Sequence, residues 1–233
     1  MKTLFLFIGL LVGLLIGSPV FAVDGKTILD TQCASCHALD GSAAKTVEDF
    51  WQRKGPDLFY AGSKYKSDWL EKWLVKPRQI RPAGVHPVQH IQPGKKRDMV
   101  NKKTLKPHLA LSTSEAKAVT ETLMTRKAPS TLVAAGDFKG GSISATFGEM
   151  VFEKFNGCMA CHEIEPNFGG LSGPEVYTAA KRYQEDYLVS FITNPQAWNP
   201  KTPMPNKHTA AANIQKIVQY LQALAKENWD EKK

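Results

Sequence analysis

The chain has 233 residues, a length that accommodates one or two domains. Its 30 Lys and Arg residues against 22 Asp and Glu give a formal net charge of +8 at pH 7. The basic residues form no long block of the kind that binds nucleic acid, and beyond the N-terminal segment no apolar run is long enough to span a bilayer. The composition therefore favours a globular chain over a nucleic-acid-binding tail or an integral membrane protein.

The first residues have the pattern of a secretory signal peptide. Lys2 supplies a positive charge, an apolar run follows from Leu4 to Ile16, and Val20-Phe21-Ala22 offers small residues at a cleavage site. Because that run is shorter than the roughly 20 residues needed to cross a bilayer, we expect cleavage after Ala22 rather than a retained anchor. Removing residues 1–22 takes away only Lys2, which lowers the formal charge from +8 to +7. The segment predicts export, to the periplasm of a Gram-negative cell.

Two pentapeptides, Cys33-Ala34-Ser35-Cys36-His37 and Cys158-Met159-Ala160-Cys161-His162, share the pattern C-x-x-C-H. This pattern is typical of c-type haem attachment, in which two thiols bond to the porphyrin and the adjacent His coordinates the iron. A redox dithiol or half a zinc site is the alternative, but the two copies use every cysteine in the chain. The sequence thus predicts two covalent haem c groups. The attachment residues are Cys33, Cys36, Cys158 and Cys161, with His37 and His162 as iron ligands.

An internal repeat surrounds the two motifs. The segment from Gly55 to Pro77 aligns without gaps with the segment from Gly173 to Pro195, which places Tyr65 on Tyr183. The chain is therefore predicted to be a tandem duplication. We expect a signal peptide (1–22), a first domain (23–128, with an insertion at about 83–100), a Pro/Gly/Ser-rich linker (129–144) and a second domain (145–233).

Each half shows the same succession of helical patterns. A helix is expected to lead into each C-x-x-C-H motif, and a second carries apolar pairs at helical spacing, such as Trp69-Leu70 and Trp73-Leu74, before a proline. Last helices are predicted at Ser114–Met124, with a capping box at Ser112 and Glu115, and at Asn213–Lys226. No segment alternates with period two, so the predicted class is all-α.

With these motifs in place, each half resembles a class I cytochrome c domain, and the whole resembles the dihaem cytochromes c4 in organisation. The resemblance implies that Gly148 and Phe152 pack against Tyr220-Leu221 where the first and last helices cross. It also implies that the carbonyls of Pro56 and Pro174 accept the ring N–H of the proximal histidines, a bond that fixes the tautomer.

Met204, between Pro203 and Pro205, matches the distal methionine of that family. The flanking prolines stiffen an extended loop and hold the thioether with little freedom to lose. Met204 is therefore predicted to be the sixth ligand of the second haem.

The sixth ligand of the first haem stays open between several residues. His108 is favoured because it lies in the right loop and a neutral imidazole binds iron readily. Lys106 aligns with Met204 but must lose a proton from an amine with a pKa of about 10.4. Met99 and His90 lie in the insertion, as does His86, and an open or water-bound iron is a further alternative.

No grouping of side chains indicates catalysis independent of haem. We therefore expect an electron-transfer protein rather than an enzyme. The alternatives are the electron-accepting subunit of a periplasmic dehydrogenase and a haem enzyme that reacts at its first iron. The basic excess, including Lys95-Lys96-Arg97 in the insertion, favours redox protein partners with an acidic docking surface and no nucleic acid partner.

Overall fold

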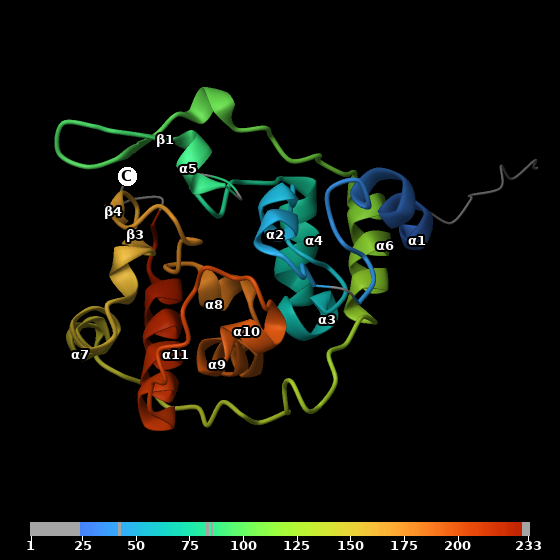
Figure 1. The fold of residues 1–233 in the computed structure, drawn as a ribbon. Helices are drawn as coiled ribbons and strands as arrows, with labels where there is room; N and C mark the ends of the chain where they lie inside the picture. The colour runs from blue at the N-terminus through green and yellow to red at the C-terminus, as the bar shows by residue number, and fades with distance from the viewer. Residues whose placement is uncertain (1–23, 42, 83, 85, 230–233) are drawn as a thin grey trace, which may run out of the picture.

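The structure is a computed structural model that describes residues 24–41, 43–82, 84 and 86–229 (Figure 1). The predicted signal peptide lies outside these residues. The described chain is largely helical and buries two hydrophobic clusters, one drawn from residues 28–123 and the other from residues 151–229. Each cluster therefore belongs to one of the two halves that the repeat defines.

The first half begins with α1 (Gly25–Ile28), which continues into a π-helical turn, η1 (Leu29–Cys33), that ends at the first motif. It closes with α6 (Thr113–Met124), whose capping box of Ser112 and Glu115 confirms the predicted start. The elements between them are α2 (Val47–Gln52), α3 (Ala61–Lys64), α4 (Ser67–Val75), α5 (Pro87–His90), β1 (Ile91–Gln92), β2 (Met99–Val100) and the 3-10 turn η2 (Lys102–Thr104).

The second half begins in the same way, with α7 (Ala145–Met150) leading through the π-helical η3 (Val151–Phe155) to the second motif. Its last helix, α11 (Ala211–Lys226), also matches the predicted one to within a few residues. The elements between them are η4 (Cys158–Ala160), β3 (Glu163–Glu165), β4 (Phe168–Gly169), α8 (Ala179–Arg182), α9 (Glu185–Thr193) and α10 (Pro195–Trp198).

Two short antiparallel hairpins add strands to a chain for which none was predicted. β1 pairs with β2 inside the insertion, and β3 pairs with β4 just after the second motif. The strands are only two or three residues long, too short for alternation of apolar and polar residues to appear in the sequence. The fold remains predominantly α-helical.

The first and last helices of each half cross at a glycine. A Cβ added to Gly25 in α1 would lie 2.1 Å from the carbonyl oxygen of Ala118, and one added to Gly148 in α7 would lie 2.4 Å from Cδ2 of Tyr220. The rings of Phe152 and Tyr220 are 5.8 Å apart, which confirms the helix crossing expected for the second half. Close approach of the two backbones therefore depends on the missing side chain.

The halves meet along a short antiparallel contact in which each residue faces its own counterpart. Tyr65 pairs with Tyr183, and their rings are 5.4 Å apart. The backbone N–H of Lys66 donates to the carbonyl of Arg182 at 2.8 Å, and that of Gln184 donates to the carbonyl of Lys64 at 2.9 Å. Lys64 aligns with Arg182, and Lys66 aligns with Gln184. The two hydrogen bonds therefore join equivalent positions, with the donor on the first half in one bond and on the second half in the other.

The segment between α6 and α7 has no helix or strand, and part of it packs on the second half. Leu132, Val133, Phe138 and Ile143 contact the second cluster. The carboxylate of Asp186 accepts hydrogen bonds from the backbone N–H groups of Gly136 (3.0 Å) and Phe138 (2.8 Å). The predicted linker is thus attached to the second half by specific contacts.

The described residues after α11 end in a buried aromatic side chain. Trp229 is buried, its ring packs on Tyr177, and its indole N–H donates to the carbonyl of Leu224 at 2.8 Å. One large aromatic side chain thus holds the first residues after α11 against the second hydrophobic cluster.

Gly148→Ala should lower the free energy of unfolding by about 1–3 kcal/mol, because the new methyl group overlaps the Tyr220 ring. This cost exceeds the gain of at most about 1 kcal/mol that alanine brings in helix propensity. Urea denaturation followed by far-ultraviolet circular dichroism measures the difference. Gly41→Ala is the control, since a Cβ there meets no atom within 4 Å. Equal stability of the two variants would contradict the close helix crossing.

Candidate functional site

Each C-x-x-C-H motif folds as a tight turn at the end of the helix that precedes it. The backbone N–H of His37 donates to the carbonyl of Cys33 at 3.0 Å, and that of His162 donates to Cys158 at 3.2 Å. The turn brings both thiols and the imidazole of one motif within a few residues of the same helix end, as attachment of one porphyrin requires.

A backbone carbonyl fixes the orientation of each motif histidine. The Nδ1 atom of His37 lies 2.7 Å from the carbonyl oxygen of Pro56, and Nδ1 of His162 lies 2.7 Å from that of Pro174. Because a carbonyl only accepts hydrogen bonds, Nδ1 carries the proton and Nε2 keeps its lone pair for a metal. These bonds confirm the roles expected for the two prolines.

The glycine before each proline makes room for the imidazole. A Cβ on Gly55 would lie 2.4 Å from Cε1 of His37, and a Cβ on Gly173 would lie 2.6 Å from Cε1 of His162. Any other residue would push the ring away from its carbonyl partner. Both proximal sites are thus shaped to hold a histidine in the position that an iron ligand needs.

Burial affects protonation at both motifs in directions that suit haem attachment. It lowers the pKa of His37 and His162, which keeps the imidazoles neutral and able to bind a metal. Burial also raises the pKa of the Cys33 thiol, and raises that of Cys158 to about 11. Redox-active dithiols need the opposite shift, so this alternative interpretation is disfavoured.

Two buried guanidinium nitrogens beside the proximal loops lack an acceptor in the described part of the chain. They are Nε of Arg53, which pairs with Asp57, and Nε of Arg182, which pairs with Glu175. Asp57 and Glu175 are aligned residues that directly follow the two prolines. A buried N–H needs an acceptor, and a propionate oxygen of haem is one that these arginines could bind.

The imidazoles of His37 and His108 lie opposite each other, with ring centroids 6.1 Å apart. A metal–imidazole bond is about 2 Å long, and the ring centre lies roughly 1 Å further, so two imidazoles on one iron have centroids about 6 Å apart. Nδ1 of His108 lies 2.7 Å from the carbonyl oxygen of Leu109, which leaves its Nε2 free. The ring of Trp73 packs against His108 at 4.6 Å.

The other candidates for this position are placed differently. His90 has its Nδ1 2.7 Å from the hydroxyl of Thr104, and His86 packs edge-on against Trp51. The side chains of Met99, in β2, and of Lys106 are exposed, as is that of His108, so exposure does not separate these candidates. Of the candidates, only His108 forms a ring contact with His37 within the described residues.

Met204 is half-buried in the loop between α10 and α11. Its carbonyl accepts a hydrogen bond from the side-chain amide of Gln196 in α10 at 2.8 Å. This bond, together with the prolines on either side, holds the backbone of the predicted ligand in place.

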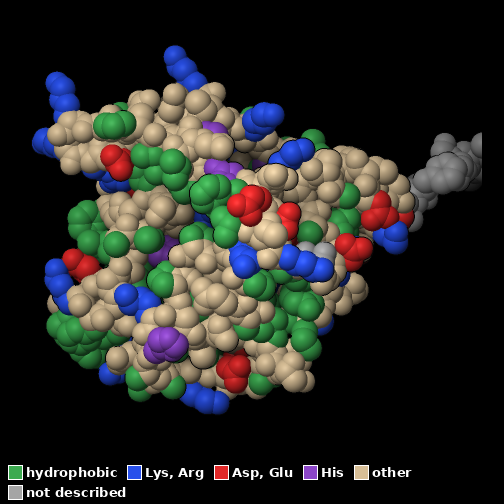
Figure 2. All heavy atoms as spheres, viewed as in Figure 1, with side chains coloured by type: hydrophobic (Ala, Val, Ile, Leu, Met, Phe, Trp, Pro, Cys, Tyr) green, Lys and Arg blue, Asp and Glu red, His purple; other side chains and the backbone are tan. Residues whose placement is uncertain are grey.

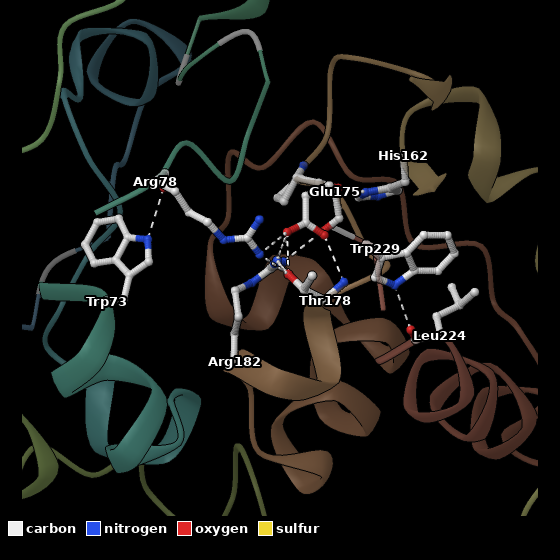
Figure 3. A network of polar contacts seen from close by, with 9 residues as sticks. Trp73, Arg78, His162, Glu175, Thr178, Arg182, Leu224 and Trp229 are labelled. Atoms are coloured by element: carbon white, nitrogen blue, oxygen red, sulfur yellow. Dashed lines mark hydrogen bonds and ion pairs between the residues drawn. The ribbon is translucent and has the colours of Figure 1, made fainter. Parts of the chain in front are cut away.

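A polar network lies beside the second site (Figure 3), and no local sequence pattern predicts it. The Arg182 guanidinium, 1% exposed, donates to Glu175 at 2.5 Å and to the Thr178 hydroxyl at 2.7 Å. Arg78 of the first half also reaches Thr178 at 3.0 Å. The sequence feature that could have indicated this network is the alignment of Asp57 with Glu175. An acidic residue directly after each proline, if buried, needs a nearby cation.

Residues 22–127 match the family described as Cytochrome c. Comparison with curated proteins and comparison with solved structures each gave no match. The match, together with the first motif and its His37–Pro56 bond, supports a c-type cytochrome with covalent haem c and a part in electron transfer. No helix among the described residues is both long and apolar enough to cross a membrane.

Gly55→Ala should displace the His37 ring and weaken its bond to Pro56. We expect a several-fold larger fraction of high-spin iron at the haem that this motif attaches, since a poorly oriented imidazole is a weaker ligand. Electron paramagnetic resonance of the oxidised protein measures that fraction, with Gly41→Ala as the control. A low-spin spectrum identical to that of the wild type would show that the glycine has no such role.

Proposed function

We propose that this protein is a periplasmic dihaem c-type cytochrome, built from two tandem class I domains, that passes single electrons between redox partners. The main support for the proposal is that the site around the motif histidine has the same geometry in both halves. In each half a C-x-x-C-H histidine donates Nδ1–H to a proline carbonyl at 2.7 Å, and a glycine lies against the imidazole.

The contact between the halves supports the tandem arrangement. Two copies of one domain related by a two-fold rotation bring identical residues together at the axis. The pairing of Tyr65 with Tyr183, and the two equivalent backbone bonds around it, have this form. The separate hydrophobic cluster of each half is also consistent with two domains.

We propose His37 and His108 as the axial ligands of the first iron, and His162 and Met204 as those of the second. Methionine ligation raises the reduction potential relative to two histidines. The two haems would then differ in potential, which gives the electron a preferred direction within one chain. Two filled axial positions at each iron favour electron transfer over reaction with a substrate.

The haem groups supply the redox-active iron, and the chain controls its surroundings. The Pro56 and Pro174 carbonyls orient the imidazoles and increase their basicity as ligands. Arg53 and Arg182 are placed to neutralise propionates, and the apolar clusters exclude water. Such fixed surroundings reduce the reorganisation that accompanies each electron transfer.

The partner is proposed to be a redox protein with an acidic surface. Lys and Arg side chains project from the surface that the insertion occupies (Figure 2). Lys95, Lys96, Lys102 and Lys103 are exposed there. Complementary charge steers the encounter of two redox proteins and makes it sensitive to salt. A docked dehydrogenase would use the same surface, so the chain could serve as its electron-accepting subunit.

The haem content tests the proposal directly. The pyridine haemochrome assay should give two c-type haems per exported chain. Replacing Cys158 and Cys161 by Ala, or Cys33 and Cys36 by Ala, should leave one haem in each case, because each pair of thiols attaches its own porphyrin. A wild-type chain with a single haem would exclude the dihaem proposal, and the variants would identify which motif carries it.

The axial ligands are tested by substitution and magnetic circular dichroism. His108→Ala should abolish the bis-nitrogen signal of one haem, whereas Lys106→Ala, which changes a neighbouring residue, should leave it intact. Met204→Ala should remove the long-wavelength absorption band of oxidised methionine-ligated haem. Loss of the nitrogen signal in Lys106→Ala alone would assign the sixth position to the lysine, and rapid cyanide binding by the wild type would indicate an open iron.

A further inference from the structure

Two acidic residues flank the proximal bond of the second half, one beside each partner. Glu163 follows His162, the donor, and Glu175 follows Pro174, the acceptor. Both are nearly excluded from solvent, at 6% and 2% exposure. Two buried carboxyl groups therefore lie next to the proposed ligand of the second iron.

Each of these carboxylates is paired with an arginine from the first half. Nη2 of Arg97, in the insertion hairpin, lies 3.2 Å from Oε1 of Glu163. Nη2 of Arg78, which follows α4, lies 3.5 Å from Oε1 of Glu175. In addition, the backbone N–H of Glu175 donates to the carbonyl of Ile80 at 3.0 Å. Figure 1 shows the insertion extending over the β3–β4 hairpin, which carries Glu163.

The arginine segment is itself held at the first site. The indole N–H of Trp73 donates to the carbonyl of Arg78 at 3.0 Å (Figure 3). The Trp73 ring packs on His108, the proposed sixth ligand of the first iron. A series of direct contacts thus connects the distal side of the first site with the proximal side of the second.

We propose that Arg78 and Arg97 form a clamp by which the first half sets the charge and position of the proximal loop at the second haem. The inference depends on the proposed function, because it requires a haem at His162. A reduced iron carries one positive charge fewer than an oxidised iron. Uncompensated carboxylates beside it therefore stabilise the oxidised form and lower the reduction potential. Arg97 compensates Glu163, whereas Glu175 is already paired with Arg182 of its own half, and Arg78 adds a second positive charge beside it. The clamp therefore raises the potential of the second haem.

The first half does not use the same device. Asp57 pairs with Arg53 of its own half, whereas Glu175 pairs with Arg78 of the other half in addition to Arg182. Ala38 follows His37 where Glu163 follows His162. The clamp therefore acts in one direction, from the first half onto the second. Arg78 and Arg97 are positioning residues that act through Glu175 and Glu163.

The test is a redox titration of the double variant R78Q/R97Q at about pH 8, where carboxyl groups are ionised. The absorption band of oxidised methionine-ligated haem reports the second haem alone. We expect its reduction potential to fall, with smaller shifts in the same direction for R78Q and R97Q singly. R78K/R97K, which restores the charges, should return the potential toward the wild-type value.

Lys66→Gln is the matched control. It removes another ion pair between the halves, Lys66 with Glu185 at 2.6 Å, which is not attached to either partner of the His162–Pro174 bond. An equal shift in Lys66→Gln would mean that loosening the interface, not the clamp, changes the potential. An unchanged potential in R78Q/R97Q with two haems bound would overturn the clamp alone. A wild-type chain without the second haem would overturn the proposed function and the clamp with it.

Discussion

The hydrogen bond from a motif histidine to a proline carbonyl constrains the structure around it more than any other contact. It spans 19 residues between His37 and Pro56 but only 12 between His162 and Pro174, yet the length is 2.7 Å in both. The first loop contains α2 and the second contains the β3–β4 hairpin. The intervening chain has thus taken two different forms while the glycine, the proline and the imidazole keep one arrangement. Such an outcome is expected when a ligand must present Nε2 in a fixed direction.

The opposite side of each site is less constrained, and there the two halves differ. In the second half a short loop carries Met204 between two prolines, directly before α11. In the first half the insertion lengthens the connection after α4, and His108 follows it close to α6. A distal ligand needs only to reach the iron from the end of a loop, so its identity and the loop length can change together. The proximal side does not allow this, because the thiols and the histidine belong to one turn.

The sequence was sufficient to predict the elements that depend on local patterns. The helices α4 and α9 were visible as apolar stripes that end before Pro77 and Pro195, and α6 through its capping box. The Pro56 and Pro174 bonds followed from a family resemblance, and the structure bears them out. The roles of His108 and Met204 as ligands remain predictions, although the 6.1 Å separation of the His37 and His108 rings supports the first.

Contacts between residues distant in the chain could not be predicted in this way. The hairpins are too short to show a period, and nothing in the sequence around Lys95-Lys96-Arg97 indicates that Arg97 forms an ion pair with Glu163. Trp229, in a segment with several charges, is buried by a contact with Tyr177 and a bond to Leu224. In each case one long-range partner determines the outcome, and the local composition contains no information about that partner.

The contact between the halves also shows how two aligned positions can differ in charge while their backbone contacts stay alike. Lys64 and Arg182 are aligned, and each donates to the carbonyl of the acidic residue after the proline: Lys64 to Asp57 at 3.2 Å and Arg182 to Glu175 at 2.7 Å. Burial lowers the pKa of Lys64 to about 8, so this cation can lose its proton in mildly alkaline solution. A guanidinium remains charged under all such conditions. At this aligned position the second half therefore has a permanent positive charge on Arg182, whereas the first half has a titratable charge on Lys64.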